Sequence, residues 1–154
     1  MKRLIFILFF FLGVTATGNA QTIRNSNNTA IASIDNDGTI RNSNNSMIAR
    51  ISNTGDIRDC NNRYVGRIES DGTVRNRNNS YLGRIESNGT VRNASNSTIG
   101  RIESNGTVRN GSNSTIGRID SDGTVRNSSN SCIGYAKGVK KEYAAVYFFF
   151  NFFK

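Results

Sequence analysis

Short β-branched runs alternate with polar turn residues along the middle of the chain. In the copy from Thr107 to Gly123, the runs Thr-Val-Arg-Asn and Ile-Gly-Arg-Ile-Asp are separated by Gly-Ser-Asn-Ser-Thr and followed by Ser-Asp-Gly. This pattern predicts the two strands of a β-hairpin. Because the copies carry no apolar stripe at helical spacing, helix is not expected there.

The hairpin pattern repeats every 17 residues without an insertion. Six full units run from Thr22 to Gly123, and a partial seventh reaches about Ala136. Constant spacing indicates that each copy is one supersecondary unit packed on its neighbours. We therefore predict an all-β fold of repeated 17-residue hairpins. The units are aligned on Gly38, Gly55, Gly72, Gly89, Gly106 and Gly123.

The invariant glycine predicts the strand register. Ser-Asn-Gly and Ser-Asp-Gly suit a three-residue loop in which only the last position needs a left-handed backbone. An aliphatic pair then lies on one face of each hairpin, and Arg and Glu lie on the other. The predicted cross-strand pairs are Glu103 with Thr107, Ile102 with Val108, and Arg101 with Arg109.

Three further columns recur once per unit. An Asn column in the connections can close Asx-turns or adopt positive φ; it contains Asn28, Asn45, Asn62, Asn79, Asn96, Asn113 and Asn130. A column of small residues is expected to tolerate Ala in place of Gly; it contains Ala32, Ala49, Gly66, Gly83, Gly100, Gly117 and Gly134. The aliphatic column before it is out of phase with the Ile102-type residues, so we expect either a bulge at the small residue or a second apolar layer shared between units. Each unit would then contribute this aliphatic residue to an axial core and its Ile–Val pair to an interface. The column contains Ile31, Ile48, Val65, Leu82, Ile99, Ile116 and Ile133.

The ends of the chain differ from the repeats. Residues 1–20 have a basic start, an apolar run and a Gly-Asn-Ala ending, which is typical of a cleavable secretory signal. Residues 21–136 form the predicted repeat domain and 137–154 a basic, then aromatic, tail. We expect export through the secretory pathway to a periplasmic, cell-surface or extracellular location. The apolar run is too short to favour a retained transmembrane anchor.

The tail from Tyr143 to Phe153 is strongly polar only at Asn151. Three roles are open: a plug on the apolar end of the repeat array, an interfacial membrane anchor, or a sorting signal. The plug is favoured because an array of short hairpins must cover its apolar end. Residues 139–150 are predicted to be helical.

Catalytic and metal chemistry lack their usual residues. The sequence contains no His and only two cysteines, so neither a Ser-His-Asp arrangement nor a four-ligand zinc site is expected. A Cys60–Cys132 disulfide is chemically permitted after export, but the two occupy different repeat positions. We predict no enzyme activity, no cofactor and no metal.

Basic residues are in excess. Removal of Lys2 and Arg3 reduces the 20 basic residues to 18, against 11 acidic residues, for a net charge of +7. The candidate polymer-binding face is an arginine array whose partner is expected to be an anionic polysaccharide or envelope surface. Nucleic acid is disfavoured because Tyr64 and Tyr81 are the only aromatic residues within the six full repeats. The array contains Arg84, Arg92, Arg101, Arg109, Arg118 and Arg126.

The repeats resemble a known family. The Thr-Ile-Arg-Asn-Ser-Asn-Asn opening, the Ile-Gly-Arg-Ile-Glu-Ser-Asn-Gly-Thr-Val-Arg-Asn cores and the ending from Ile133 to Glu142 are similar to those of exported five-fold beta-flower proteins. The resemblance covers essentially the whole mature chain. It implies hairpin petals about a central axis and carries no activity or ligand. This chain has six full units and part of a seventh instead of five. The sequence is therefore compatible with a larger ring and with an open spiral.

An exported structural or interaction module is the leading functional hypothesis. The alternative is a fibre-forming β-solenoid surface protein, in which each unit is one coil and the Asn column forms a ladder.

Overall fold

The computed structural model describes residues 21–24, 30–34 and 38–153. The predicted signal peptide and Asn28 lie outside these ranges. The fourteen strands and one helix described are β1 Gln21–Arg24, β2 Ala30–Ile34, β3 Thr39–Asn42, β4 Met47–Ile51, β5 Asp56–Asp59, β6 Tyr64–Ile68, β7 Thr73–Asn76, β8 Tyr81–Ile85, β9 Thr90–Asn93, β10 Thr98–Ile102, β11 Thr107–Asn110, β12 Thr115–Ile119, β13 Thr124–Asn127, β14 Cys132–Tyr135 and α1 Lys141–Phe149.

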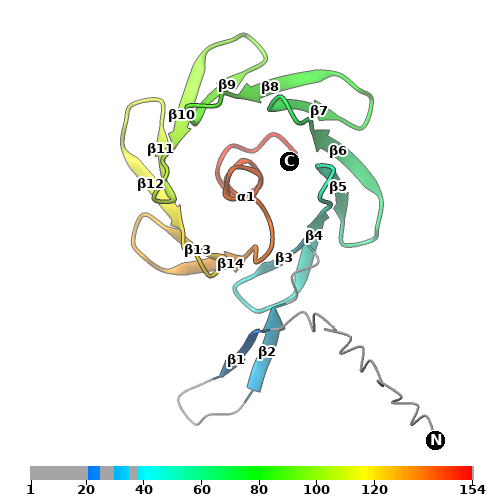
Figure 1. Ribbon diagram of the computed structural model, residues 1–154, viewed down its shortest axis with the longest axis vertical. Helices are drawn as coiled ribbons and strands as arrows, with labels where there is room; N and C mark the ends of the chain where they lie inside the picture. Colours follow the sequence, from blue (N-terminus) through cyan, green and yellow to red (C-terminus); the bar gives the residue numbers. More distant parts are fainter. Residues whose placement is uncertain (1–20, 25–29, 35–37, 154) are drawn as a thin grey trace, which may run out of the picture.

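Twelve antiparallel strands, β3 to β14, form a closed ring (Figure 1). Each strand pairs with its neighbours in the chain, and β14 pairs with β3 to complete the circle. We use the word petal for a pair of consecutive ring strands joined by an outer loop. The six petals are β3–β4, β5–β6, β7–β8, β9–β10, β11–β12 and β13–β14. The strands β1 and β2 form a separate two-stranded sheet. The second to the seventh repeats therefore make a ring rather than a spiral, and the first repeat forms the separate β1–β2 hairpin. Each unit is a hairpin rather than a solenoid coil.

Tight glycine turns connect successive petals and confirm the predicted register. Arg101 lies opposite Arg109, and Ile102 lies opposite Val108. Gly106 has φ +89° and donates its N–H to the carbonyl of Glu103 at 3.0 Å. This is the left-handed conformation that glycine adopts most readily.

The outer loops depend on two Asn positions. Asn113 has φ +64°, as expected for this column, and its described counterparts have φ between 61° and 64°. Three residues earlier, the Asn110 side chain accepts the N–H groups of Ser112 and Ser114 at 3.0 and 2.9 Å. The positive φ at Asn113 is as predicted, whereas the Asx-turn is formed by Asn110 and not by the predicted column.

The Ile–Val pairs, and not the single aliphatic column, form most of the axial core. Ile102 and Val108 are 3% and 0% exposed, and equivalent pairs line the inside of the ring. Ile99 is the extra residue of a bulge and is only partly buried. The prediction had these two roles reversed, because it did not place the C-terminal helix inside the ring. The bulge lies at Ile99 and not at the small residue that follows it, and Ile99 packs against the core while remaining partly buried.

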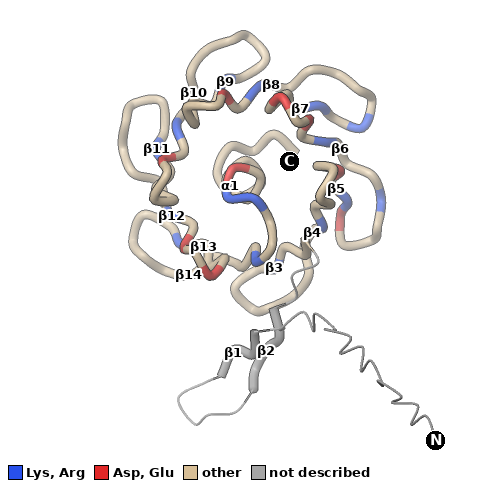
Figure 2. Tube along the Cα trace, viewed as in Figure 1, with Lys and Arg blue, Asp and Glu red and all other residues tan. Residues whose placement is uncertain are grey.

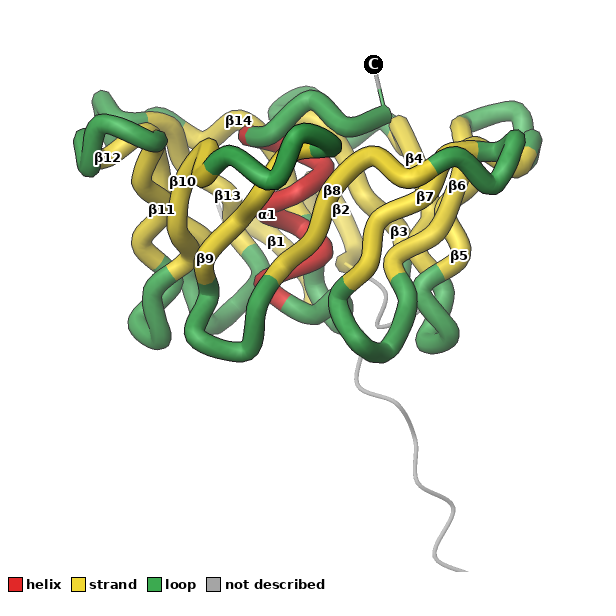
Figure 3. Tube along the Cα trace, turned by 90° about the horizontal axis from the view of Figure 1, so that it is seen from above, coloured by secondary structure: helices red, strands yellow, loops and turns green. Residues whose placement is uncertain are grey.

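Helix α1 fills the inside of the ring (Figure 3), whereas the favoured prediction placed the tail as a plug on the apolar end of the repeat array. Its residues Tyr143 to Val146 are buried. The helix runs between the rim formed by the glycine turns, here called the turn rim, and the rim from which the outer loops spread, here called the petal rim. Its bounds agree with the helix expected over residues 139–150. No helix in the described part of the chain is long and apolar enough to cross a bilayer.

The C-terminal end of α1 and the residues that follow it place one aromatic side chain on each petal. The side chain of Tyr147 donates a hydrogen bond to the carbonyl of Ile48 at 3.3 Å, in petal β3–β4. Each of the other five petals presents its small-column glycine to one phenylalanine. These contacts are Gly134 with Phe148, Gly117 with Phe149, Gly100 with Phe150, Gly83 with Phe152, and Gly66 with Phe153.

This packing corrects the expectation that Ala would be tolerated at Gly100. A Cβ atom there would lie 2.5 Å from Cε1 of Phe150 and closer still to the carbonyl oxygen of Arg109. The column requires small residues, as predicted. In the petal of Ala49, the aromatic residue of the tail is Tyr147, which contacts the backbone carbonyl of Ile48. The presence of Ala at position 49 therefore does not show that Ala would fit at position 100.

Candidate functional site

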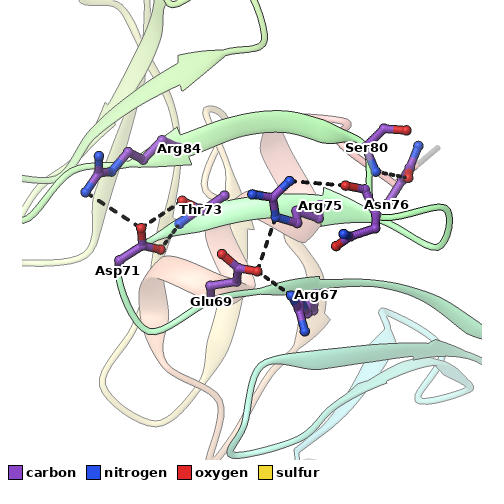
Figure 4. A network of polar contacts seen from close by, with 9 residues as sticks. Arg67, Glu69, Asp71, Thr73, Arg75, Asn76, Ser80 and Arg84 are labelled. Carbon is purple, nitrogen blue, oxygen red and sulfur yellow. Dashed lines mark hydrogen bonds and ion pairs between the residues drawn. The ribbon is translucent and has the colours of Figure 1, made fainter.

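The outer face of the ring carries alternating arginines and carboxylates at the bases of the petals (Figure 2). They lie there because the residues next to each inward Ile–Val pair point outward. In Figure 4, Glu69 lies between Arg67 and Arg75, and Arg75 Nε is 3.2 Å from its carboxylate. The predicted ion-pair face is therefore present in the structure.

The six predicted arginines divide into two rows. Arg92, Arg109 and Arg126 lie on the first strand of their petals and each pair with a carboxylate across a glycine turn, at 2.6, 2.6 and 2.9 Å. The hydrogen bond with Asp120 raises the pKa of Arg126. The other row comprises Arg84, Arg101 and Arg118, on the second strand, and is exposed.

The first row also anchors the outer loops. Arg109 donates from its terminal nitrogen to the carbonyl oxygen of Asn113 at 3.1 Å, which is the residue with positive φ. Arg92 and Arg126 make the same bond to Asn96 and Asn130. These arginines therefore link the glycine turn to the outer loop and have a structural role.

The second row is freer to meet a partner. In the described part of the chain, Arg101 makes no hydrogen bond or ion pair, and Arg84 reaches Asp71 only at 4.0 Å. Arg118 pairs with Asp120 at 2.6 Å but keeps about half of its side chain exposed, at 51%. Exposed ion pairs of this kind contribute only about 0–1 kcal/mol.

Asp71 caps its own glycine turn. Hydrogen bonds from the backbone N–H and the hydroxyl of Thr73 lower the pKa of Asp71, and the Arg84 guanidinium lowers it further. Asn88 holds the equivalent turn in the next unit by the same backbone bond, at 2.9 Å from the Thr90 nitrogen. The carboxylate therefore caps this glycine turn.

A cleft of about 510 Å³ opens at the turn rim, between α1 and three glycine turns. It contains Asp71 and Glu86 together with Lys140 and Lys141. Lys141 donates to the carbonyl of Ser104 at 3.1 Å and lies 3.6 Å from Glu142. Glu69 and Glu142 also line the cleft, so four carboxylates outnumber the two lysines and the lining does not favour an anionic ligand.

The described residues contain no cluster of three or more His, Cys, Asp or Glu side chains that could hold a metal. Cys60 and Cys132 are both free thiols, so the disulfide is not formed. What the outer face offers chemically is repeated hydrogen-bond donation and positive charge.

Sequence reasoning missed two exposed arginines on the outer loops, Arg63 and Arg77. Every other described outer loop lacks a charged residue between its strands. The sequence signal for both is that they depart from the residue types found at the same positions of the other repeats.

The comparisons with known proteins agree with the ring of hairpins. The model of the 5-fold beta-flower protein family matches residues 14–86 and 54–153, which together span most of the chain. No curated protein and no solved structure gives a significant match. The family description is five-fold, whereas the ring here has six petals. The chain belongs to the 5-fold beta-flower protein family.

Proposed function

We propose that this protein is an exported, non-catalytic interaction module that binds an anionic polysaccharide of the cell envelope through its outer arginines. The observation that carries the proposal is the row of exposed arginines at the same place on consecutive petals. Arg84, Arg101 and Arg118 repeat once per petal around a closed ring. A row of this kind matches the repeated charge of an anionic polymer.

Repeated arginines can give an affinity for a polymer that one exposed arginine cannot give. A single exposed charge pair is weak, but several sites engaged by one chain act together through effective concentration. Asp120 and the other carboxylates reduce the positive potential of the face. We therefore expect modest affinity that falls steeply with salt, since exposed charges are screened beyond about 8 Å at physiological ionic strength.

The experiment is a binding titration of polygalacturonate at low and at physiological salt, using protein that begins at Gln21. The test variant is R101S/R118S. Its control is K137S/K140S, which removes two positive charges at the turn rim, outside both the arginine row and the outer loops. We expect the first variant to lose most polymer binding at low salt. If the wild type binds at neither salt, or if R101S/R118S binds as well as wild type, the proposal is wrong.

Export rests on the residue pattern of the first twenty positions. Expression of the full chain with its own N-terminus should yield protein outside the cytoplasm that begins near Gln21. N-terminal sequencing of that protein checks the cleavage site. Recovery of the intact chain from the cytoplasm alone would contradict this part of the proposal.

A further inference from the structure

A groove on the petal rim separates petals β5–β6 and β7–β8. Its volume is about 580 Å³, and its lining includes the rings of Phe152 and Phe153 together with Leu82. Arg63 and Tyr64 border it from one petal, and Arg77 borders it from the next. The groove therefore combines an apolar lining with two guanidinium groups on opposite banks.

The chemistry of this groove departs from the repeat. Position 63 is Ser in the other five described petals, and position 77 is Ser, Cys, Ala or Gly in them. Figure 2 shows the result, with basic residues on the outer loops of these two petals and none on the loops of the others. Since the backbone is the same in every petal, the fold does not need arginine at either position.

Neither arginine is used by the fold. The described residues offer no hydrogen bond or ion pair to the side chain of Arg63 or of Arg77. Both are exposed. Their donors are therefore available to a ligand, and guanidinium groups suit two-point hydrogen bonding to a carboxylate or sulfate.

Asp59 is the opposing charge in the groove. Its carboxylate accepts the backbone N–H groups of Asn61 and Arg63, each at 2.9 Å, so it holds the loop as its Asn equivalents do. Two arginines against one aspartate leave the groove with a net positive charge. This selects an anion over a cation or a neutral molecule.

Tyr64 adds an amphipathic surface to the same bank. It is 36% exposed, and position 64 is Met, Thr or Cys in the other petals except for Tyr81. An aromatic ring beside charged donors suits a ligand that has an apolar face and a polar edge. A pyranose ring that carries a carboxylate or a sulfate has both.

We propose that this groove binds one acidic sugar residue, with Arg63 and Arg77 holding its anionic group and Tyr64 packing against the ring. The inference deepens the proposed function, because it rests on the polymer being an acidic polysaccharide. The arginine row would then supply length-dependent affinity, and the groove would supply recognition of the sugar. The two contributions can be separated by the length of the ligand.

The test is an NMR titration of labelled protein with a galacturonic acid trisaccharide, and with neutral maltotriose for comparison. The groove variants are R63S/R77A and Y64T, which introduce residues found in other petals. The matched controls are Y81T, which alters an equally exposed tyrosine outside the groove lining, and R101S/R118S, which removes the same charge elsewhere. Thermal melts establish that every variant is folded.

We expect the acidic trisaccharide to shift resonances of the groove residues and maltotriose to leave them unchanged. The loss of two charged hydrogen-bonding groups should weaken binding at least about tenfold in R63S/R77A. Y64T should weaken it several-fold, whereas Y81T and R101S/R118S should bind the trisaccharide like wild type.

Three results would overturn the groove assignment. These are no shift with the acidic trisaccharide, equal binding of maltotriose, or equal loss in R63S/R77A and R101S/R118S. Polymer binding that survives in R63S/R77A but is lost in R101S/R118S would reject the groove and keep the arginine row. The absence of polymer binding in the wild type would reject the proposed function itself.

Discussion

Replacing Gly100 with Ala tests the contact between the tail and the petals. The new methyl group would lie 2.5 Å from Cε1 of Phe150. Favourable carbon contacts lie at about 3.5–4.0 Å, so the overlap is about 1 Å. The phenyl group of Phe150 can rotate away, but the carbonyl oxygen of Arg109 on the neighbouring strand is also too close. Because that oxygen belongs to the backbone, it cannot move without disturbing the strand pairing.

The expected cost of G100A is about 2–3 kcal/mol, in the upper part of the range for overpacked cores. For a ring of this size, that cost lowers the melting temperature by roughly 10 °C. The assay is thermal and urea unfolding of G100A, F150A and the double variant. F150A removes the overlap with the phenyl group but leaves the overlap with the Arg109 carbonyl. G100A should therefore cost about 1 kcal/mol less in the F150A background than in the wild type.

The matched control is A49G, in the same column. It removes a buried methyl group and should cost about 1 kcal/mol through the backbone freedom of glycine. A G100A protein that melts within about 2 °C of wild type would refute the packing described here. An identical cost of G100A with and without Phe150 would show that the ring does not occupy this place.

Three further predictions concern the turns and the plug. G106A should cost about 1 kcal/mol or more in urea unfolding, because φ is +89° and the added Cβ would meet the carbonyl of Ile119. G106N carries the same Cβ atom but should cost less than G106A, since Asn adopts the left-handed region more readily than Ala. Deletion of residues 143–154 should expose the apolar inside of the ring and give dye binding or aggregation; a soluble, equally stable product would contradict the plug. The pKa of Asp71 is lowered in the fold, so its contribution to stability is present above its ordinary pKa and is lost as the pH falls through the folded value. D71N should keep the turn, as Asn88 does, and reduce the loss of stability between about pH 7 and about pH 3; an unchanged loss would contradict this assignment.

Much of the petal geometry could be predicted from the sequence because it is fixed locally. Gly106 sets the turn, the turn sets the pairing of Ile102 with Val108, and alternation then places Arg109 outward. Ring closure could not be predicted, because it depends on pairing between β14 and β3, which are far apart in the chain.

The inside of the ring was misassigned for a related reason. Whether Ile102 or Ile99 faces the axis depends on what fills the axis, and the occupant is α1, which lies outside the repeats. The arginine row followed from the register, so the sequence could predict it. The loop arginines Arg63 and Arg77 could have been found only by asking which exposed positions break the repeat.

The closed ring with its central helix has a consequence for how the chain folds. Most strand contacts join neighbours in sequence, which favours fast and nearly independent formation of petals. Two steps cannot be completed petal by petal: the pairing of β14 with β3, and the placement of α1, which follows β14 in the chain. These late steps couple all six petals, so the finished ring should unfold as one cooperative unit, although a row of similar hairpins without closure would fray from its ends.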